Sequence, residues 1–64
     1  MTHIIKQISN LLLSARSKSG VSQEDLAEAL GMSRITVHRI ETGSKVPNMA
    51  EFIMWYRALG LNWY

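Results

Sequence analysis

The sequence contains no cysteine, a single proline and no long apolar run. Without cysteine it has neither a disulfide nor a thiolate metal site, and its two histidines lie too far apart in sequence to suggest another kind of metal site. No apolar segment approaches the roughly 20 residues of a transmembrane helix. We therefore expect a cytoplasmic protein that uses no metal and no cofactor and does not enter a membrane.

Length and composition favour one small globular domain. The chain has 64 residues, and 47% of them are hydrophobic, which is too high a fraction for a disordered segment. A chain this short supports a single domain, residues 1–64, with a limited core, so association with a second copy would add stability. The net charge of +2 permits a polyanionic partner but is too small to demonstrate one.

Glycines divide the chain into segments that each carry a helical period of apolar residues. The expected helices cover about residues 4–17, 22–30, 33–41 and 48–59, and they are followed by Gly20, Gly31, Gly43 and Gly60. Ser22 and Ser33 are the expected N-caps, and Asn48 with Glu51 has the pattern of a capping box. No segment alternates with a period of two, so the sequence predicts an all-α fold.

Each expected helix has an apolar face. The residues expected to point inward are Ile4, Ile8, Leu11, Leu12, Ala15, Leu26, Ala27, Leu30, Val37, Ile40, Met49, Phe52, Ile53, Tyr56 and Leu59. All five aromatic residues lie within the last thirteen positions. We expect Phe52 and Tyr56 to close the core over the first helix.

The segment 22–41 has the spacing of a helix-turn-helix, in which two short helices are joined by a tight turn that contains glycine. Ala27 lies where the helices cross, and a larger side chain would separate them. Gly31 supplies a backbone conformation that a Cβ would penalise, and Val37 fills the wedge between the helices. The same spacing also fits an αα-hairpin in a bundle that binds nothing, so the apolar pattern alone leaves both interpretations open.

The outward-facing residues of the third helix favour the DNA-binding interpretation. One face carries four side chains at helical spacing with no acid among them: Arg34, Ile35, His38 and Arg39. A major-groove surface needs this mixture, because arginine pairs with guanine edges and an apolar side chain contacts thymine methyl groups. We assign all four residues to base reading. For His38, simple solvation is the alternative.

Several motifs, taken in order, resemble the lambda-repressor-like (Cro/C1, or XRE) family of helix-turn-helix domains. They are Gly20-Val21-Ser22-Gln23-Glu24-Asp25-Leu26-Ala27, Leu30-Gly31-Met32-Ser33, Ile40-Glu41-Thr42-Gly43, Val46-Pro47 and Leu59-Gly60. The resemblance spans about residues 8–61. It implies a compact bundle of four or five helices that binds double-stranded operator DNA as a homodimer.

The resemblance also implies roles for single residues. It places Arg34, Ile35 and Arg39 at base-reading positions, and it joins Arg16 and Glu41 as a buried ion pair between the first and third helices. Gln23 would brace the recognition helix as well as bind a phosphate. The residues assigned to phosphate contacts are Gln23, Ser33, Thr36, Thr42, Ser44, Lys45 and Lys18. For Lys18, stabilisation of a helix dipole is the alternative.

Three features depart from the family pattern. Leu13 stands where many members have a basic residue, which removes one phosphate contact. Trp55 and Tyr56 stand where smaller aliphatic residues are usual, and the fifth helix is expected to be absent or a stub. We expect the segment 52–64 to form the dimer surface, because tryptophan and tyrosine are favoured at interfaces; the residues assigned to it are Trp55, Trp63 and Tyr64. Closure of the core is the alternative for these aromatics.

Two functions fit these observations. The leading one is a sequence-specific transcriptional regulator, a repressor of phage or mobile-element type in a bacterium, which binds a palindromic operator. The alternative is an antitoxin-type module that binds DNA and also holds a partner protein through its aromatic C-terminal segment. An enzyme is not expected, because the sequence has no nucleophile–base–orienter set and no glycine-rich phosphate loop.

Overall fold

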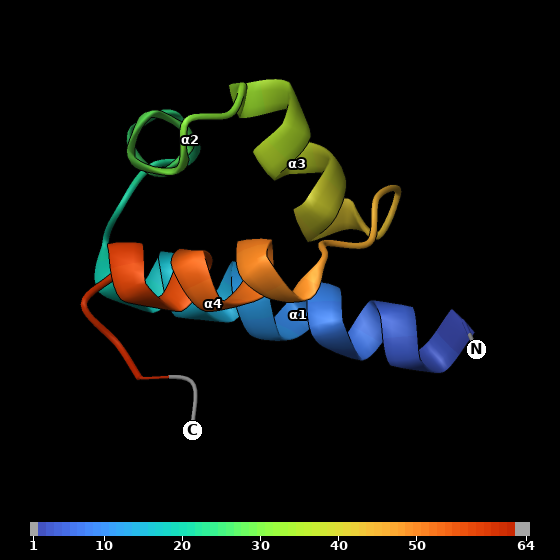
Figure 1. Cartoon of the computed structure of the whole chain (residues 1–64). Coiled ribbons are helices and arrows are strands. Elements are labelled where there is room, and N and C mark those ends of the chain that lie inside the picture. The colour runs from blue at the N-terminus through green and yellow to red at the C-terminus, as the bar shows by residue number, and fades with distance from the viewer. Residues whose placement is uncertain (1, 63–64) are drawn as a thin grey trace.

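Four α-helices make up the part of the chain that the computed structural model describes, residues 2–62. They are α1 (Thr2–Ser19), α2 (Gln23–Leu30), α3 (Arg34–Thr42) and α4 (Met49–Ala58). In Figure 1, α1 and α4 lie together, and α2 and α3 pack on one side of this pair. No strand occurs in residues 2–62, which confirms the all-α prediction, and residues 61–62 follow α4 without starting a fifth helix.

The helices α2, α3 and α4 begin at the capping residues that the sequence indicates. Oγ of Ser22 accepts a hydrogen bond from the Asp25 backbone N–H at 3.0 Å, and Oγ of Ser33 accepts one from a backbone N–H at 3.1 Å. Asn48 and Glu51 form a complete capping box, in which each side chain accepts from the other residue's backbone N–H. These bonds satisfy amide donors that the first turn of a helix leaves unpaired.

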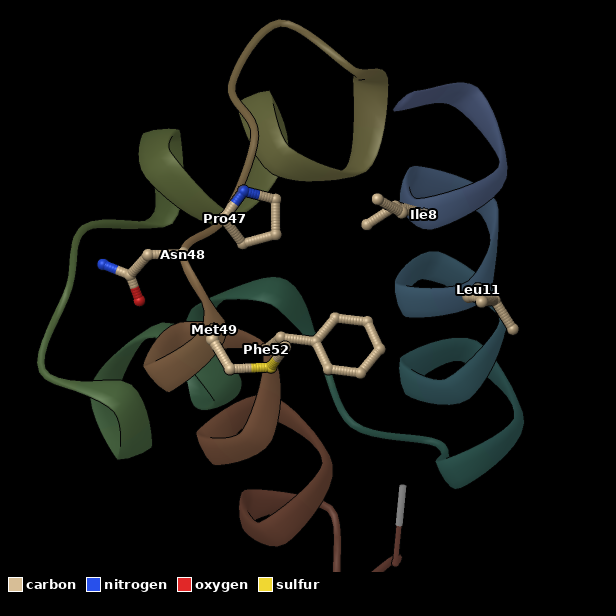
Figure 2. Close-up of a pocket in the computed structure, with 6 residues that line it drawn as sticks. All are labelled: Ile8, Leu11, Pro47, Asn48, Met49 and Phe52. Carbon is tan, nitrogen blue, oxygen red and sulfur yellow. The ribbon is translucent and has the colours of Figure 1, made fainter. Parts of the chain in front are cut away.

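A hollow remains where α1 and α4 lie side by side. With 18 residues, α1 is longer than the 10-residue α4, and its N-terminal end extends beyond the other helices (Figure 1). The hollow measures about 280 Å³ and is lined by Ile8, Leu11, Pro47, Asn48, Met49 and Phe52 (Figure 2). Ile4, Leu11 and Met49 were expected to point inward, but all three side chains are more than half exposed. The apolar faces of α1 and α4 are therefore only partly covered.

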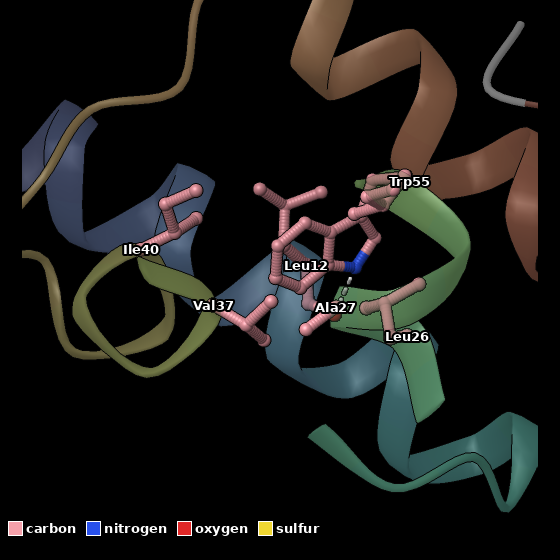
Figure 3. Close-up of a cluster of buried hydrophobic side chains, with 7 residues drawn as sticks. Leu12, Leu26, Ala27, Val37, Ile40 and Trp55 are labelled. Carbon is pink, nitrogen blue, oxygen red and sulfur yellow. Dashed lines mark hydrogen bonds between the residues drawn. The ribbon is translucent and has the colours of Figure 1, made fainter. Parts of the chain in front are cut away.

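The core is centred on Trp55, whose side chain is fully buried. Its indole N–H donates to the backbone oxygen of Leu12 at 3.1 Å, so the ring ties α4 to α1 (Figure 3). The residues buried with it come from the three other helices: Leu12, Leu26, Ala27, Leu30, Val37 and Ile40. The assignment of Trp55 to a dimer surface is therefore wrong, because an enclosed indole with a satisfied N–H belongs to the fold. Phe52 and Tyr56 pack against this cluster, as expected.

Candidate nucleic-acid interface

The helix-turn-helix consists of α2, the turn 31–33 and α3. Gly31 ends α2 in the left-handed conformation, with φ at 68°, which glycine adopts without the cost of a Cβ. The Met32 backbone N–H then donates to the Ala27 oxygen at 3.0 Å and closes the turn. Val37 and Ile40 are fully buried on the inner face of α3. This packing fixes which face of α3 points away from the protein.

The outer face of α3 carries the four side chains assigned to base reading. All four are exposed, and Ile35 is 58% exposed although it is apolar. Among residues 2–62, neither Arg34 nor Arg39 takes part in a salt bridge. Their guanidinium groups are thus available to donate to base edges or phosphates. An apolar side chain beside two such cations is the mixture that a major-groove surface requires.

A buried polar network lies beneath the outer face and holds α3 to α1 and α2. Glu41 is 6% exposed, and its carboxylate accepts from Arg16 Nε at one oxygen and from Arg16 Nη2, at 3.1 Å, at the other. Arg16 Nη1 donates to the backbone oxygen of Val21 at 2.8 Å. The structure thus contains the Arg16–Glu41 contact that the resemblance implies. This one guanidinium fork joins α1, the α1–α2 turn and α3.

Gln23 connects this network to the outer face. Its Nε2 donates to Oε1 of Glu41 at 2.8 Å, and the same nitrogen lies 3.5 Å from Nδ1 of His38. A carboxylate only accepts hydrogen bonds, so the amide nitrogen of Gln23 has to face it. The approach to His38 is at the outer limit of a hydrogen bond. No sequence pattern indicates the His38 approach, because it depends on how α2 and α3 are placed relative to each other.

The hydroxyl groups assigned to phosphates lie at the two ends of α3. At its start, the Ser33 and Thr36 oxygens are 2.9 Å apart. At its end, Thr42 Oγ1 donates to the Arg39 backbone oxygen at 3.2 Å and lies 3.3 Å from Oγ of Ser44. All these hydrogen bonds lie at the protein surface. A phosphate can therefore replace the present partner of one of these hydroxyl groups without disturbing a buried contact.

The two lysines assigned to phosphates differ in their surroundings. Lys18 lies in the last turn of α1 and is exposed. Lys45 is exposed too, but its Nζ lies 3.6 Å from Oε2 of Glu51, the capping-box residue of α4. An exposed pair at this distance contributes little stability. Lys45 can therefore turn from Glu51 to a phosphate without loss to the fold.

A profile described as a helix-turn-helix domain matches residues 7–62, which cover well over half of the chain. The chain belongs to the helix-turn-helix domain family. This DNA-binding domain agrees with the lambda-repressor-like resemblance of the motifs. No curated protein matches the sequence.

Residues 2–62 contain neither a candidate membrane-spanning helix nor a cluster of potential metal ligands. No helix in this range has both the length and the apolarity needed to cross a bilayer, and no three acidic or histidine side chains in it gather as around a metal ion. Trp63 and Tyr64 lie outside the described residues, so their place in a dimer surface stays a prediction.

Proposed function

We propose that this helix-turn-helix domain is a transcriptional repressor of phage or mobile-element type, acting in the bacterial cytoplasm, which inserts α3 into the major groove of its operator. The observation that carries the proposal is the outer face of α3. It combines two arginines that have no salt-bridge partner within residues 2–62 with an isoleucine that is 58% exposed. Such residues stabilise little in the free protein and match the chemistry of guanine edges and thymine methyl groups.

The contacts divide into two kinds. Arg34, Ile35, His38 and Arg39 read base edges, and the hydroxyls and lysines at the helix ends bind phosphates. Phosphate contacts fix the position and tilt of α3 without reading sequence, and base contacts provide the specificity. The Arg16–Glu41–Gln23 network supports both kinds of contact, because it holds α3 rigidly to the rest of the domain.

The proposed operator is palindromic and is bound by a homodimer. One recognition helix reads only a few base pairs, which is too short a site for specificity in a genome. A two-fold pair of domains would place its recognition helices about 34 Å apart, one turn of DNA. Selection of bound sequences from random DNA tests this directly. We expect enrichment of two symmetric half-sites. If the selection enriched no sequence at all, the proposal would be overturned.

Salt dependence provides a second test. Lys18 and Lys45 are the two lysines assigned to phosphates, so the logarithm of the binding constant should fall with that of the salt concentration with a slope of about −2 per bound copy. Lys45→Gln should reduce this slope by about 0.9 per copy. Lys6→Gln is the matched control, because Lys6 is an exposed lysine of α1 with no assigned contact. If the wild type, Lys45→Gln and Lys6→Gln all had the same slope, Lys45 would not contact a phosphate.

A module that binds DNA and also holds a partner protein is the second candidate. Exposed apolar side chains on α1 and α4 favour it, because surfaces of this kind serve protein–protein contacts. The two candidates differ in the behaviour of the purified chain. A repressor that works as a homodimer associates with itself, whereas a chain whose apolar surface is reserved for another protein stays monomeric.

A further inference from the structure

Exposed apolar side chains of α1, of α4 and of the segment before α4 either line the hollow between these helices or lie close in sequence to residues that line it. Ile4, Leu11, Val46 and Met49 are between 52% and 66% exposed. In Figure 2, Ile8 points from α1 into the hollow and Phe52 points toward α1 from the other side. We call this area the groove surface; it consists of Ile4, Ile8, Leu11, Val46, Pro47, Met49 and Phe52.

The groove surface has both of the shapes that a self-complementary contact needs. Two-fold pairing places a patch against its own copy, so the patch must contain a recess and a projection that fills it. The recess is the hollow of about 280 Å³, which is larger than any single aliphatic side chain. The projections are Leu11 and Met49, which line the hollow and are 53% and 66% exposed.

Charge also favours a second copy as the occupant. Every copy of the chain carries a net charge of +2, so two copies repel each other over most of their surfaces. The groove surface contains no charged residue. Beside it, Lys45 and Glu51 present both signs within 3.6 Å of each other. Two copies can therefore meet here without placing like charges in contact.

We infer that the groove surface binds the same surface of a second copy, and that this contact forms the homodimer of the proposed function, on which the inference rests. The largest apolar patch on a soluble monomer typically measures about 300–600 Å². Two patches of that size would together bury at most about 1,200 Å², the lower limit of a stable standard interface. The dimer is therefore weak in free solution and is strengthened when two adjacent half-sites hold both copies.

The position of the groove surface is compatible with DNA binding. Val46 and Pro47 directly follow the loop assigned to phosphates, and none of the four base-reading residues belongs to the groove surface. Pairing through it leaves the outer face of α3 uncovered. It also requires nothing of Trp63 and Tyr64, the alternative dimer residues.

Sedimentation equilibrium of the purified chain, without DNA and up to high micromolar concentration, tests the inference. Met49→Glu and Leu11→Glu place a carboxylate on the groove surface, and Met54→Glu and Leu13→Glu are matched controls. The control residues are exposed, belong to the same two helices and do not line the hollow. We expect the wild type and both controls to form dimers. The groove variants should dimerise at least about tenfold more weakly, because each dimer would bury two carboxylates.

Thermal unfolding of each variant and binding to a duplex with one half-site, taken from the random-DNA selection, complete the experiment. All variants should unfold within a few degrees of the wild type. All except Leu13→Glu should bind the single half-site alike, because position 13 lies where the related domains contact a phosphate. If both groove variants still formed dimers as strongly as the wild type, the inference would be overturned. If the dimer were instead lost when Trp63 and Tyr64 are removed, the contact would lie at those two residues. A wild type that stays monomeric would also overturn the inference. Dimerisation without any DNA binding would instead refute the proposed function and leave the groove contact standing.

Discussion

The two faces of α3 differ in what surrounds them. The inner face carries Val37, Ile40 and Glu41, which are at most 6% exposed. Apolar neighbours surround the first two, and three side-chain hydrogen bonds satisfy the carboxylate of the third. The outer face carries Arg34, Ile35 and Arg39, which are all exposed. One helix thus contains residues whose partners lie within the protein and residues whose chemistry the fold does not use.

This difference predicts that substitutions on α3 separate stability from DNA binding. Removing a buried group leaves its partners unsatisfied and lowers the free energy of unfolding. Removing an exposed group that touches nothing in the protein changes stability by at most about 0.5 kcal/mol. Effects on DNA binding at an unchanged melting temperature would therefore identify the outer face as the reading surface.

The largest effect is expected for Glu41→Ala on the inner face. The substitution strands the Arg16 guanidinium, whose side chain is only 15% exposed, and should lower the free energy of unfolding by about 3–5 kcal/mol. Urea or thermal unfolding followed by circular dichroism measures it. Glu28→Ala is the control, because Glu28 is an exposed glutamate of α2. A melting temperature unchanged by Glu41→Ala would mean that the network does not hold α3 in place.

The helix-turn-helix itself is readable from the sequence because its determinants are local. Ser22, Ser33 and Asn48 each cap a helix through a contact three residues away, and Gly31 acts on its own backbone. The inner face of α3 is also local, since only Val37 and Ile40 provide it with apolar side chains. Determinants of this kind can be recognised in the sequence without knowledge of the tertiary structure.

The burial of Trp55 cannot be predicted from the sequence in the same way. The segment that forms α4 carries large apolar residues on nearly all sides, at 49, 52–56 and 59, so the helical period selects no unique inner face. The packing of α1 decides it: Leu12 offers a backbone oxygen that satisfies the indole N–H, and Met49 is left outside. The contacts of Gln23 with His38 and of Lys45 with Glu51 likewise depend on distances between elements, which composition and spacing do not fix.

An intermediate effect, on binding alone, is expected for Arg34→Ala on the outer face. Loss of its contact with a base should weaken binding to the selected operator by about 1–3 kcal/mol and relax the preference at one base pair. The melting temperature should stay within the error of the wild type. Arg57→Ala removes the same charge from an exposed position on α4 and is the control. If Arg34→Ala weakened binding to matched and mismatched sites equally, Arg34 would be a phosphate contact.

The smallest effect is expected for Gln23→Met, because Gln23 lies between the two faces. Its amide is 2.8 Å from the Glu41 carboxylate but 3.5 Å from His38, so it acts mainly on the inner face. Methionine keeps the length of the side chain and removes the donor. Glu41 retains both bonds from Arg16. The free energy of unfolding should therefore fall by only about 1 kcal/mol.

A double-mutant cycle with His38→Ala sharpens this last prediction. Since 3.5 Å is the limit of a hydrogen bond, the coupling between Gln23 and His38 should be below about 0.5 kcal/mol, both in stability and in operator binding. Any loss of DNA affinity on Gln23→Met should then persist in full in the His38→Ala background, as a phosphate contact of Gln23 requires. If that loss disappeared in the His38→Ala background, Gln23 would act on DNA by orienting the imidazole, and the separation between the two faces of α3 would fail at this residue.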